Sequence, residues 1–429
     1  MANVISISND RQAKEAKARV AELSETLSHD QVFTSLVRGL PKEVVAGFRR
    51  SLSLERQQIA ENLDAYEQAT IGNFVPLKKM AGNDLGSQLI VARIAKGLTQ
   101  KELARKLGLQ EQAIQRYEAE RYKSISLSSF QKFASVLNLK FSADHATGYM
   151  SEWGLPFEVD HSEVGKVLKH AKASGWLKEE DSSTERALEA LKRHVGDHVV
   201  KYGTPSLLRT GLEVKDRAKD LSFLVWKAQI ARKSEAIIKE RKPRYRWAEP
   251  SWLVDLVRMS TDESKLCDIP NFLLEYGIVL TFEPQIPGMN VDGAAFLIDE
   301  TPIIGLTLRN DALDSFWFTL LHEIAHVVLH YRFGLQAGFF DNIEDLDTDI
   351  AEEEADNFAS NMLIPDEIWT RSPARISKSP EPIVSLARHL NIHPAIVFGR
   401  IRMERKNYAL FSDGIRRGIV RKIFTGTSN

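Results

Sequence analysis

Cysteine and long apolar runs are the scarcest features of this 429-residue sequence. Cys267 is the only cysteine, which excludes an intramolecular disulfide and is typical of proteins in a reducing compartment. No stretch approaches the roughly 18–20 continuous apolar residues that a membrane-spanning helix needs. The N-terminal residues lack a basic region followed by an apolar core, so we expect no secretory signal. Together these absences predict a cytoplasmic protein that does not enter a membrane.

The net charge of the whole chain is also close to zero, but basic and acidic residues are unevenly distributed along it. The sequence has 57 basic and 58 acidic residues, a formal net charge of −1, and 43% hydrophobic residues, which is ordinary for a globular protein. Residues 85–125 contain eight Lys/Arg and four Glu, whereas residues 341–356 contain nine acidic residues and no basic one. Residues 371–429 contain twelve basic and three acidic residues. The positive excess in residues 85–125 is typical of a module that faces phosphate.

The motif HEIAH at residues 322–326 carries the clearest chemical pattern. Two histidines four residues apart lie on one face of a helix, about one turn from each other, so both can bind a single metal ion. Glu323 can reach a water molecule on that ion and act as a general base. The flanking residues are mostly apolar and include neither proline nor glycine, which predicts a buried helix. The pattern therefore predicts Zn²⁺ at His322 and His326.

A catalytic zinc site needs a third protein ligand and an open position for water. Arg332 occupies the place, ten residues after His322, where a metzincin would have its third histidine. We therefore expect a carboxylate from the acidic run EEEAD at residues 352–356. Glu352 is preferred, because small residues on its helical face permit close approach to the HEIAH helix. Glu354 is the competing ligand, and at about 200° around the helix from Glu352 it cannot face the same metal.

Two further side chains are expected near the metal without binding it. Asp356 shares the face of Glu352 and can accept a hydrogen bond from a ligating histidine. His330, one turn beyond His326, is expected to pack or to orient a ligand. The competing interpretation has no metal, because paired histidines often only pack and acidic helix starts often only satisfy the helix dipole. The joint occurrence of the histidine pair, the base and the acidic helix favours the metal site.

Residues 252–370 resemble the ImmA/IrrE family of metallopeptidases. The resemblance rests on five segments in this order: GIVLTF, DGAAF, PIIGLTLR, FWFTLLHEIAHVVLH and EEEADNFASNMLIP. It implies an α+β, zincin-like domain with a small sheet. It also implies Zn²⁺ held by His322, His326 and Glu352, with Glu323 as the base, and a role in cutting or controlling a repressor.

A second pattern, LTQKELARKLGLQEQAIQRYEAER at residues 98–121, predicts two helices joined by a tight turn. Thr99 can cap the first helix with Glu102 as its capping-box partner, and Gly108 forms the turn. The second helix, which begins near Gln110, would enter the major groove of DNA by its N-terminal residues.

The polar residues of this pattern suit contacts with bases and phosphates. Glutamine pairs with adenine, arginine pairs with guanine, and an acidic side chain accepts from cytosine, although it can equally repel phosphate. A residue in the first turn of the preceding helix can reach a phosphate. The candidate base contacts are Gln110, Glu111, Gln112 and Arg116, and the candidate phosphate contact is Gln100.

This segment, within a compact five-helix pattern from about residue 87 to residue 139, resembles the XRE family, the lambdoid phage repressor type of helix-turn-helix. The resemblance implies binding to a double-stranded DNA operator. We expect a homodimer, because one helix-turn-helix reads only a half-site. The competing interpretation is a helical bundle that uses the turn for packing alone. A similar pattern at residues 385–402 is expected to be a helical subdomain that packs on the peptidase rather than a DNA contact.

These patterns predict a mainly α, multidomain chain with an all-α helix-turn-helix domain and an α+β metallopeptidase domain. The predicted segments are an N-terminal helical segment for dimerisation or docking (1–80), the helix-turn-helix domain (81–145), a helical connecting region (146–250), the metallopeptidase domain (251–370) and a basic helical subdomain (371–429).

Two functional hypotheses follow. The first is a zinc endopeptidase that relieves repression by cutting a repressor, a partner protein or itself after a stress or phage signal. The second is an antitoxin or repressor that binds its own operator and a cognate toxin, with the metal domain as sensor or scaffold. The second follows from a similarity of the N-terminal half to HigA-type antitoxins.

Overall fold

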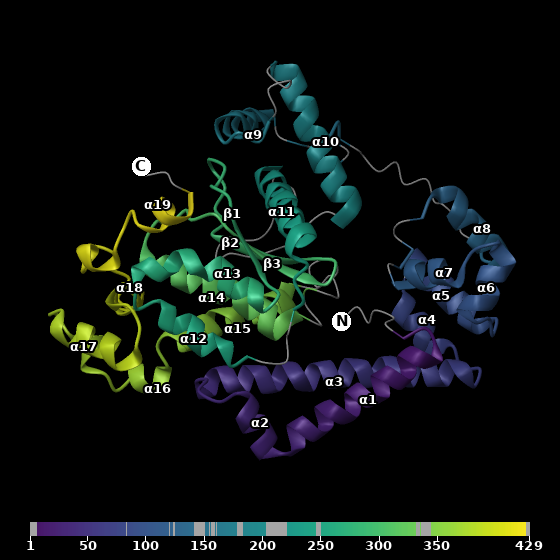
Figure 1. The fold of residues 1–429 in the computed structure, drawn as a ribbon, viewed down its shortest axis with the longest axis horizontal. Helices are drawn as coiled ribbons and strands as arrows, with labels where there is room; N and C mark the ends of the chain where they lie inside the picture. The colour runs from purple at the N-terminus through teal and green to yellow at the C-terminus, as the bar shows by residue number, and fades with distance from the viewer. Residues whose placement is uncertain are drawn as a thin grey trace. The chain divides into compact units, whose positions relative to one another are not determined.

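The computed structural model describes residues 7–82, 84–119, 121–122, 125–140, 151–153, 155, 159, 161–177, 183–202, 221–245, 250–331, 335 and 345–425 (Figure 1). The chain divides into two compact units. Unit 1 comprises residues 1–33 and 49–147, and unit 2 comprises residues 34–48 and 148–429. Helices dominate both units in the described part, and the sheet found there is small. This confirms the expected mainly α class with an all-α helix-turn-helix domain and an α+β domain.

Unit 1 is built from helices throughout its described residues. Apolar side chains of α3 to α8 form its core, with Leu77, Leu89, Leu103 and Ile114 all fully buried. The expected five-helix pattern is only partly right, because the described residues form four helices between residues 85 and 137, and α4 precedes them. The helices of the unit are α1 (Asp10–Ser28), part of α2 (Asp30–Leu36), most of α3 (Lys42–Thr70), α4 (Val75–Ala81), α5 (Leu85–Ala95), α6 (Gln100–Leu107), α7 (Glu111–Ala119) and α8 (Leu127–Leu137).

The turn between α6 and α7 forms as the sequence predicts. The Thr99 N–H donates to Glu102 Oε2 over 2.8 Å, and the Glu102 N–H donates to Thr99 Oγ1 over 3.1 Å, which confirms the capping box. Gly108 ends α6 with a φ of 69°, a left-handed conformation that side chains rarely adopt. α7 then begins at Glu111. Local sequence thus determines where α6 begins and where it ends.

The sheet of unit 2 has three strands among the described residues, in the order β1–β3–β2. β1 (Val279–Phe282) runs parallel to the central strand β3 (Thr301–Leu306), and β2 (Gly293–Ile298) runs antiparallel to it. Every residue of β3 is buried, as expected of a central strand covered on both faces. The helix α13 (Ile269–Glu275) leads into β1.

The remaining helices of unit 2 surround this sheet. In the described part of the chain, no helix combines the length and the apolar character that crossing a bilayer requires. The helices are α9 (His161–Ala173), α10 (Thr184–Tyr202), α11 (Leu221–Arg241), α12 (Trp252–Met259), α14 (Leu313–His330), α15 (Asp345–Leu363), α16 (Asp366–Trp369), α17 (Glu381–Leu390), α18 (Pro394–Glu404) and α19 (Val420–Thr425), with short 3₁₀ turns at Glu263–Asp268, Pro373–Ile376 and Ser412–Ile415.

Two glycines show which helix covers each face of the sheet. A Cβ at Gly305 would lie 3.1 Å from Trp226 of α11, and a Cβ at Gly293 would lie 2.7 Å from Glu323 of α14. Gly305 pairs with the residue that follows Gly293, and neighbouring residues of a strand point to opposite faces. α11 and α14 therefore cover opposite faces, and β2 forms the sheet edge beside the HEIAH helix.

The C-terminal pattern at residues 385–402 forms α17 and α18. Gly399 of α18 lies so close to α14 that a Cβ there would be 2.6 Å from the Cβ of Asp314. α18 therefore packs directly on α14 of the α+β domain.

Candidate metal centre and DNA-contact face

α14 carries both histidines of the HEIAH motif on one face. Leu321 and Ile324 are fully buried, which fixes the rotation of the helix about its axis. His322 and His326 then lie one turn apart, with ring centroids 5.0 Å apart and their Nε2 atoms 3.2 Å apart. The four-residue spacing thus brings two potential ligand nitrogens together.

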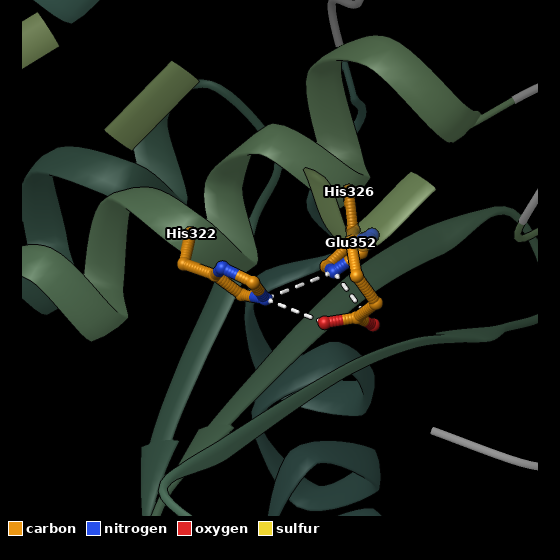
Figure 2. A group of neighbouring side chains, drawn as sticks. All are labelled: His322, His326 and Glu352. Carbon is orange, nitrogen blue, oxygen red and sulfur yellow. Dashed lines mark hydrogen bonds and ion pairs between the residues drawn. The ribbon is translucent and has the colours of Figure 1, made fainter. Parts of the chain in front are cut away.

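Glu352 of α15 completes a group of three donors, pointing from its own helix toward the two histidines (Figure 2). Its Oε2 lies 3.3 Å from His322 Nε2, and its Oε1 lies 3.6 Å from His326 Nε2. One ligand atom from each residue lies within 4.8 Å of the other two. Two imidazole nitrogens and one carboxylate are the donors of many catalytic zinc sites, so these residues fit Zn²⁺. We call His322, His326, Glu352 and Glu323 the metal centre.

The close approach of α15 depends on small residues. Ala355 and Ala359 lie on the same helical face as Glu352 and are fully buried. The prediction of Glu352 rather than Glu354 as the ligand is based on these small residues. Glu354 instead directs its Oε2 to His330 Nε2 at 3.0 Å. The geometry therefore favours Glu352 over Glu354 as the third donor.

The two histidines also have partners on the side away from Glu352. Nδ1 of His322 lies 2.9 Å from Oδ1 of Asp356, which is the contact that the sequence predicts for this aspartate. Nδ1 of His326 lies 3.1 Å from Nδ1 of His330, a ring that is only 2% exposed. Such outer partners fix the orientation of a ligating imidazole.

Glu323 lies buried between α14 and β2, only 3% exposed. The absence of a side chain at Gly293 makes the room for its carboxylate. Burial raises the pKa of Glu323 to about 8, against the opposing effects of His322 and of a hydrogen bond from the Ala295 N–H. A carboxylate that can hold or release a proton near neutral pH suits the role of a general base.

The charge balance of the centre favours a cation. Burial alone would lower the pKa of His322, but Asp356, Glu352 and Glu323 outweigh it and raise that pKa to about 10. Burial holds the pKa of His326 well below its usual range, and the positive charge of His322 adds to this effect. The carboxylates thus favour positive charge at His322, and the same carboxylates would also attract a metal cation.

The four residues that the sequence predicts to contact bases lie on α7 or directly before it, and Arg116 is in the last turn of the helix. Gln110, Glu111, Gln112 and Arg116 are all exposed, and we call them the DNA-contact face. Gln115 was not singled out by the sequence, but it is also exposed and donates to Glu111 Oε1 over 3.3 Å. Its position four residues after Glu111 is the signal that places it on the same face.

Gln100 differs from the other four. It is 7% exposed, and its side-chain amide donates to Glu118 Oε2 over 2.7 Å. Its Oε1 accepts a hydrogen bond of 3.2 Å from Asn9. The side chain that was expected to reach phosphate is thus engaged inside unit 1, and its phosphate contact stays a prediction that would require these bonds to open.

A buried ion pair lies behind the DNA-contact face. Arg93 of α5 donates from Nη2 to Glu118 of α7 over 2.8 Å, and also to the carbonyl of Ser8 over 2.6 Å. Both charged residues are at most 5% exposed. The sequence did not single out this pair, because a partner 25 residues away leaves no local pattern. It ties α7 to α5 and to the start of the described chain.

Comparison with protein families gives two matches within the chain. Residues 89–143 match the family described as helix-turn-helix, and residues 274–397 match the family described as IrrE N-terminal-like domain, an M78 peptidase family. Neither a curated protein nor a solved structure matches the chain. The two matches confirm the predicted combination of an XRE-type helix-turn-helix with an ImmA/IrrE-like domain in one polypeptide.

Proposed function

Because the chain joins an XRE-type helix-turn-helix to a domain of the M78 peptidase family, we propose that it is a DNA-binding regulator that hydrolyses a peptide bond at a zinc centre. The observation that carries this proposal is the convergence of His322, His326 and Glu352 beside the buried Glu323. The protein cut is a repressor, a partner or the chain itself, in response to stress or phage. Four residues thus supply the ligands and the base of a metallopeptidase.

The proposed chemistry assigns one step to each group. A bound Zn²⁺ would acidify a water molecule and polarise the carbonyl of the peptide bond. Glu323 takes a proton from that water as its oxygen adds to the carbonyl carbon. Glu323 then gives the proton to the amide nitrogen as the C–N bond breaks, which leaves a carboxylic acid and an amine. His322 and His326 keep their Nε2 atoms directed at the metal position throughout.

The substitution Glu323→Gln tests this mechanism, because it removes the base and keeps the shape of the side chain. We expect unchanged zinc content by atomic absorption and no cleavage of the chain itself or of a co-expressed neighbouring repressor, followed by mass spectrometry. Wild-type cleavage also has to stop when a chelator removes the zinc. Cleavage by Glu323→Gln at the wild-type rate would exclude Glu323 as the base.

The DNA-contact face supports the second part of the proposal. α7 presents its polar residues to solvent, as major-groove recognition requires, and unit 1 encloses its own core. We propose binding of a homodimer to a two-fold operator near its own gene. Affinity should fall steeply with salt because phosphate contacts release counterions. Salt-independent binding, or none to that DNA, would contradict operator recognition.

The alternative is a repressor or antitoxin that binds a toxin, with the metal centre as sensor or scaffold. It is supported by the division into two compact units, because a separate DNA-binding unit does not need hydrolysis to act. A neighbouring gene for a small ribonuclease-like toxin that co-purifies with the chain would favour it. Cleavage that is lost in Glu323→Gln would favour the endopeptidase.

A further inference from the structure

His330 and Glu354 lie beside the metal centre and are not among its three donors. His330 is one helical turn beyond His326 and is 2% exposed. Its Nδ1 lies 3.1 Å from His326 Nδ1, and its Nε2 lies 3.0 Å from Glu354 Oε2. The buried ring therefore connects a metal-facing imidazole of α14 with a carboxylate of α15.

His326, His330 and Glu354 form a chain of hydrogen bonds, and the position of each proton in it follows from the carboxylate of Glu354. An ionised carboxylate only accepts hydrogen bonds, so Nε2 of His330 carries a proton and donates it to Glu354. The other nitrogen of a neutral imidazole is an acceptor, so His330 Nδ1 accepts a hydrogen bond from the Nδ1–H of His326. His326 is then left with an unprotonated Nε2. This is the nitrogen that lies 3.6 Å from Glu352 Oε1.

The orientation of His322 is determined by a carboxylate that contacts its ring directly. Its Nδ1–H donates a hydrogen bond of 2.9 Å to Asp356 Oδ1, so a metal ion that displaces the proton of Nε2 meets the lone pair of that nitrogen. With the metal bound, both histidines thus present Nε2 beside Glu352. For His322 a carboxylate does this directly, and for His326 a carboxylate does it through a second imidazole.

We propose that His330 and Glu354 are positioning residues that keep the proton of His326 on Nδ1 and so present its Nε2 to the metal. The inference rests on the proposed zinc centre and adds to it the outer residues that determine how tightly the metal is held. It also gives separate roles to the acidic residues of α15. Glu352 is a donor to the metal, whereas Asp356 and Glu354 each fix one histidine.

Zinc affinity tests the proposal in the full chain, by competition with a chromophoric chelator. Glu354→Gln replaces an obligatory acceptor by an amide, whose N–H₂ can donate to His330 Nε2 and reverse the row of protons. We expect zinc binding to weaken about 10- to 100-fold, as is usual when an outer partner is lost. Glu353→Gln is the matched control, because it removes the same charge from the adjacent, exposed position. It should leave the affinity unchanged.

A second measurement detects the proton itself and needs neither zinc nor activity. Nitrogen-15 NMR of histidine-labelled, metal-free protein should show His326 protonated on Nδ1 in the wild type, and loss of this tautomer in Glu354→Gln. Protonation of His326 on Nε2 in the wild type, or equal zinc affinity of the two glutamine variants, would overturn the inference. A wild-type chain that binds no zinc would overturn the proposed function as well.

Discussion

The metal centre and the DNA-contact face differ in what their side chains contact. At the metal centre the functional side chains hold one another, since His322, His326 and Glu352 converge and each histidine has an outer partner. On the DNA-contact face Gln110, Gln112 and the other polar side chains extend into solvent. The residues of the first region contact one another inside the protein, whereas those of the second are free to contact the bases of a bound DNA, as we propose.

The position of the DNA-contact face depends on an ion pair that is buried behind it. Arg93 and Glu118 form a buried ion pair that fixes α7, although neither belongs to the face itself. A substitution within the metal centre should therefore lower the rate of hydrolysis. A substitution on the DNA-contact face should weaken the affinity for DNA, and a substitution of the buried ion pair should lower the free energy of unfolding of unit 1. Three substitutions separate these effects.

The largest effect is expected from Glu118→Gln. It leaves the buried guanidinium of Arg93 without its opposite charge, which costs about 3–5 kcal/mol when one partner of a buried pair is removed. The free energy of unfolding of unit 1 should fall by that amount, and DNA binding should be lost with it. Hydrogen exchange of α5 to α8 measures this loss.

Unit 2 supplies the control for that measurement. All seven tryptophans lie in unit 2, so tryptophan fluorescence during urea unfolding reports that unit and should not change. Glu15→Gln breaks the exposed Arg11–Glu15 pair in unit 1 and should leave exchange unaltered, since surface pairs contribute little. Equal exchange in the two variants would mean that the buried pair does not hold α7.

An intermediate effect is expected from Gly293→Ala at the metal centre. The new Cβ would lie 2.7 Å from Glu323 Oε1 and 2.9 Å from its Cγ, so the base must move. A displacement on the order of 1 Å should lower kcat about 100-fold. Zinc affinity should stay unchanged, because the ligands are not touched. Gly165→Ala in α9, where a Cβ meets nothing within 4 Å, is the matched control and should cleave normally.

The sequence predicted those parts of both regions that depend on spacing along one helix. The four-residue spacing of His322 and His326 determines a local geometry that tertiary packing only preserves, and so does the capping pair of Thr99 and Glu102. The choice of Glu352 also followed from one helical face, with its small residues directed at α14.

What the sequence did not predict depends on partners distant in the chain. The room for Glu323 comes from Gly293 on β2, and this depends on the register of a sheet edge. The burial of Gln100 depends on Glu118 and on Asn9, which is 91 residues away. The contact between His330 and Glu354 was not predicted either. The spacing along α15 gives the direction in which Glu354 points, but not which residue of another helix it meets.

The smallest effect is expected on the DNA-contact face, from Arg116→Ala. It should weaken operator binding about tenfold and relax the base preference at one position, which is typical of a lost side-chain contact to a base. Unfolding of unit 1 should not change, because this side chain is exposed and lies over the ring of Tyr117, 5.2 Å from its centroid. Gln100→Ala should show the reverse pattern, with a stability loss of about 1 kcal/mol from its hydrogen bonds to Glu118 and Asn9 and little change in affinity. If Gln100→Ala instead weakened binding to operator and unrelated DNA equally, without affecting unfolding, Gln100 would be a phosphate contact after all. Both affinities are measured by fluorescence anisotropy at one fixed salt concentration, because the phosphate contribution varies with salt.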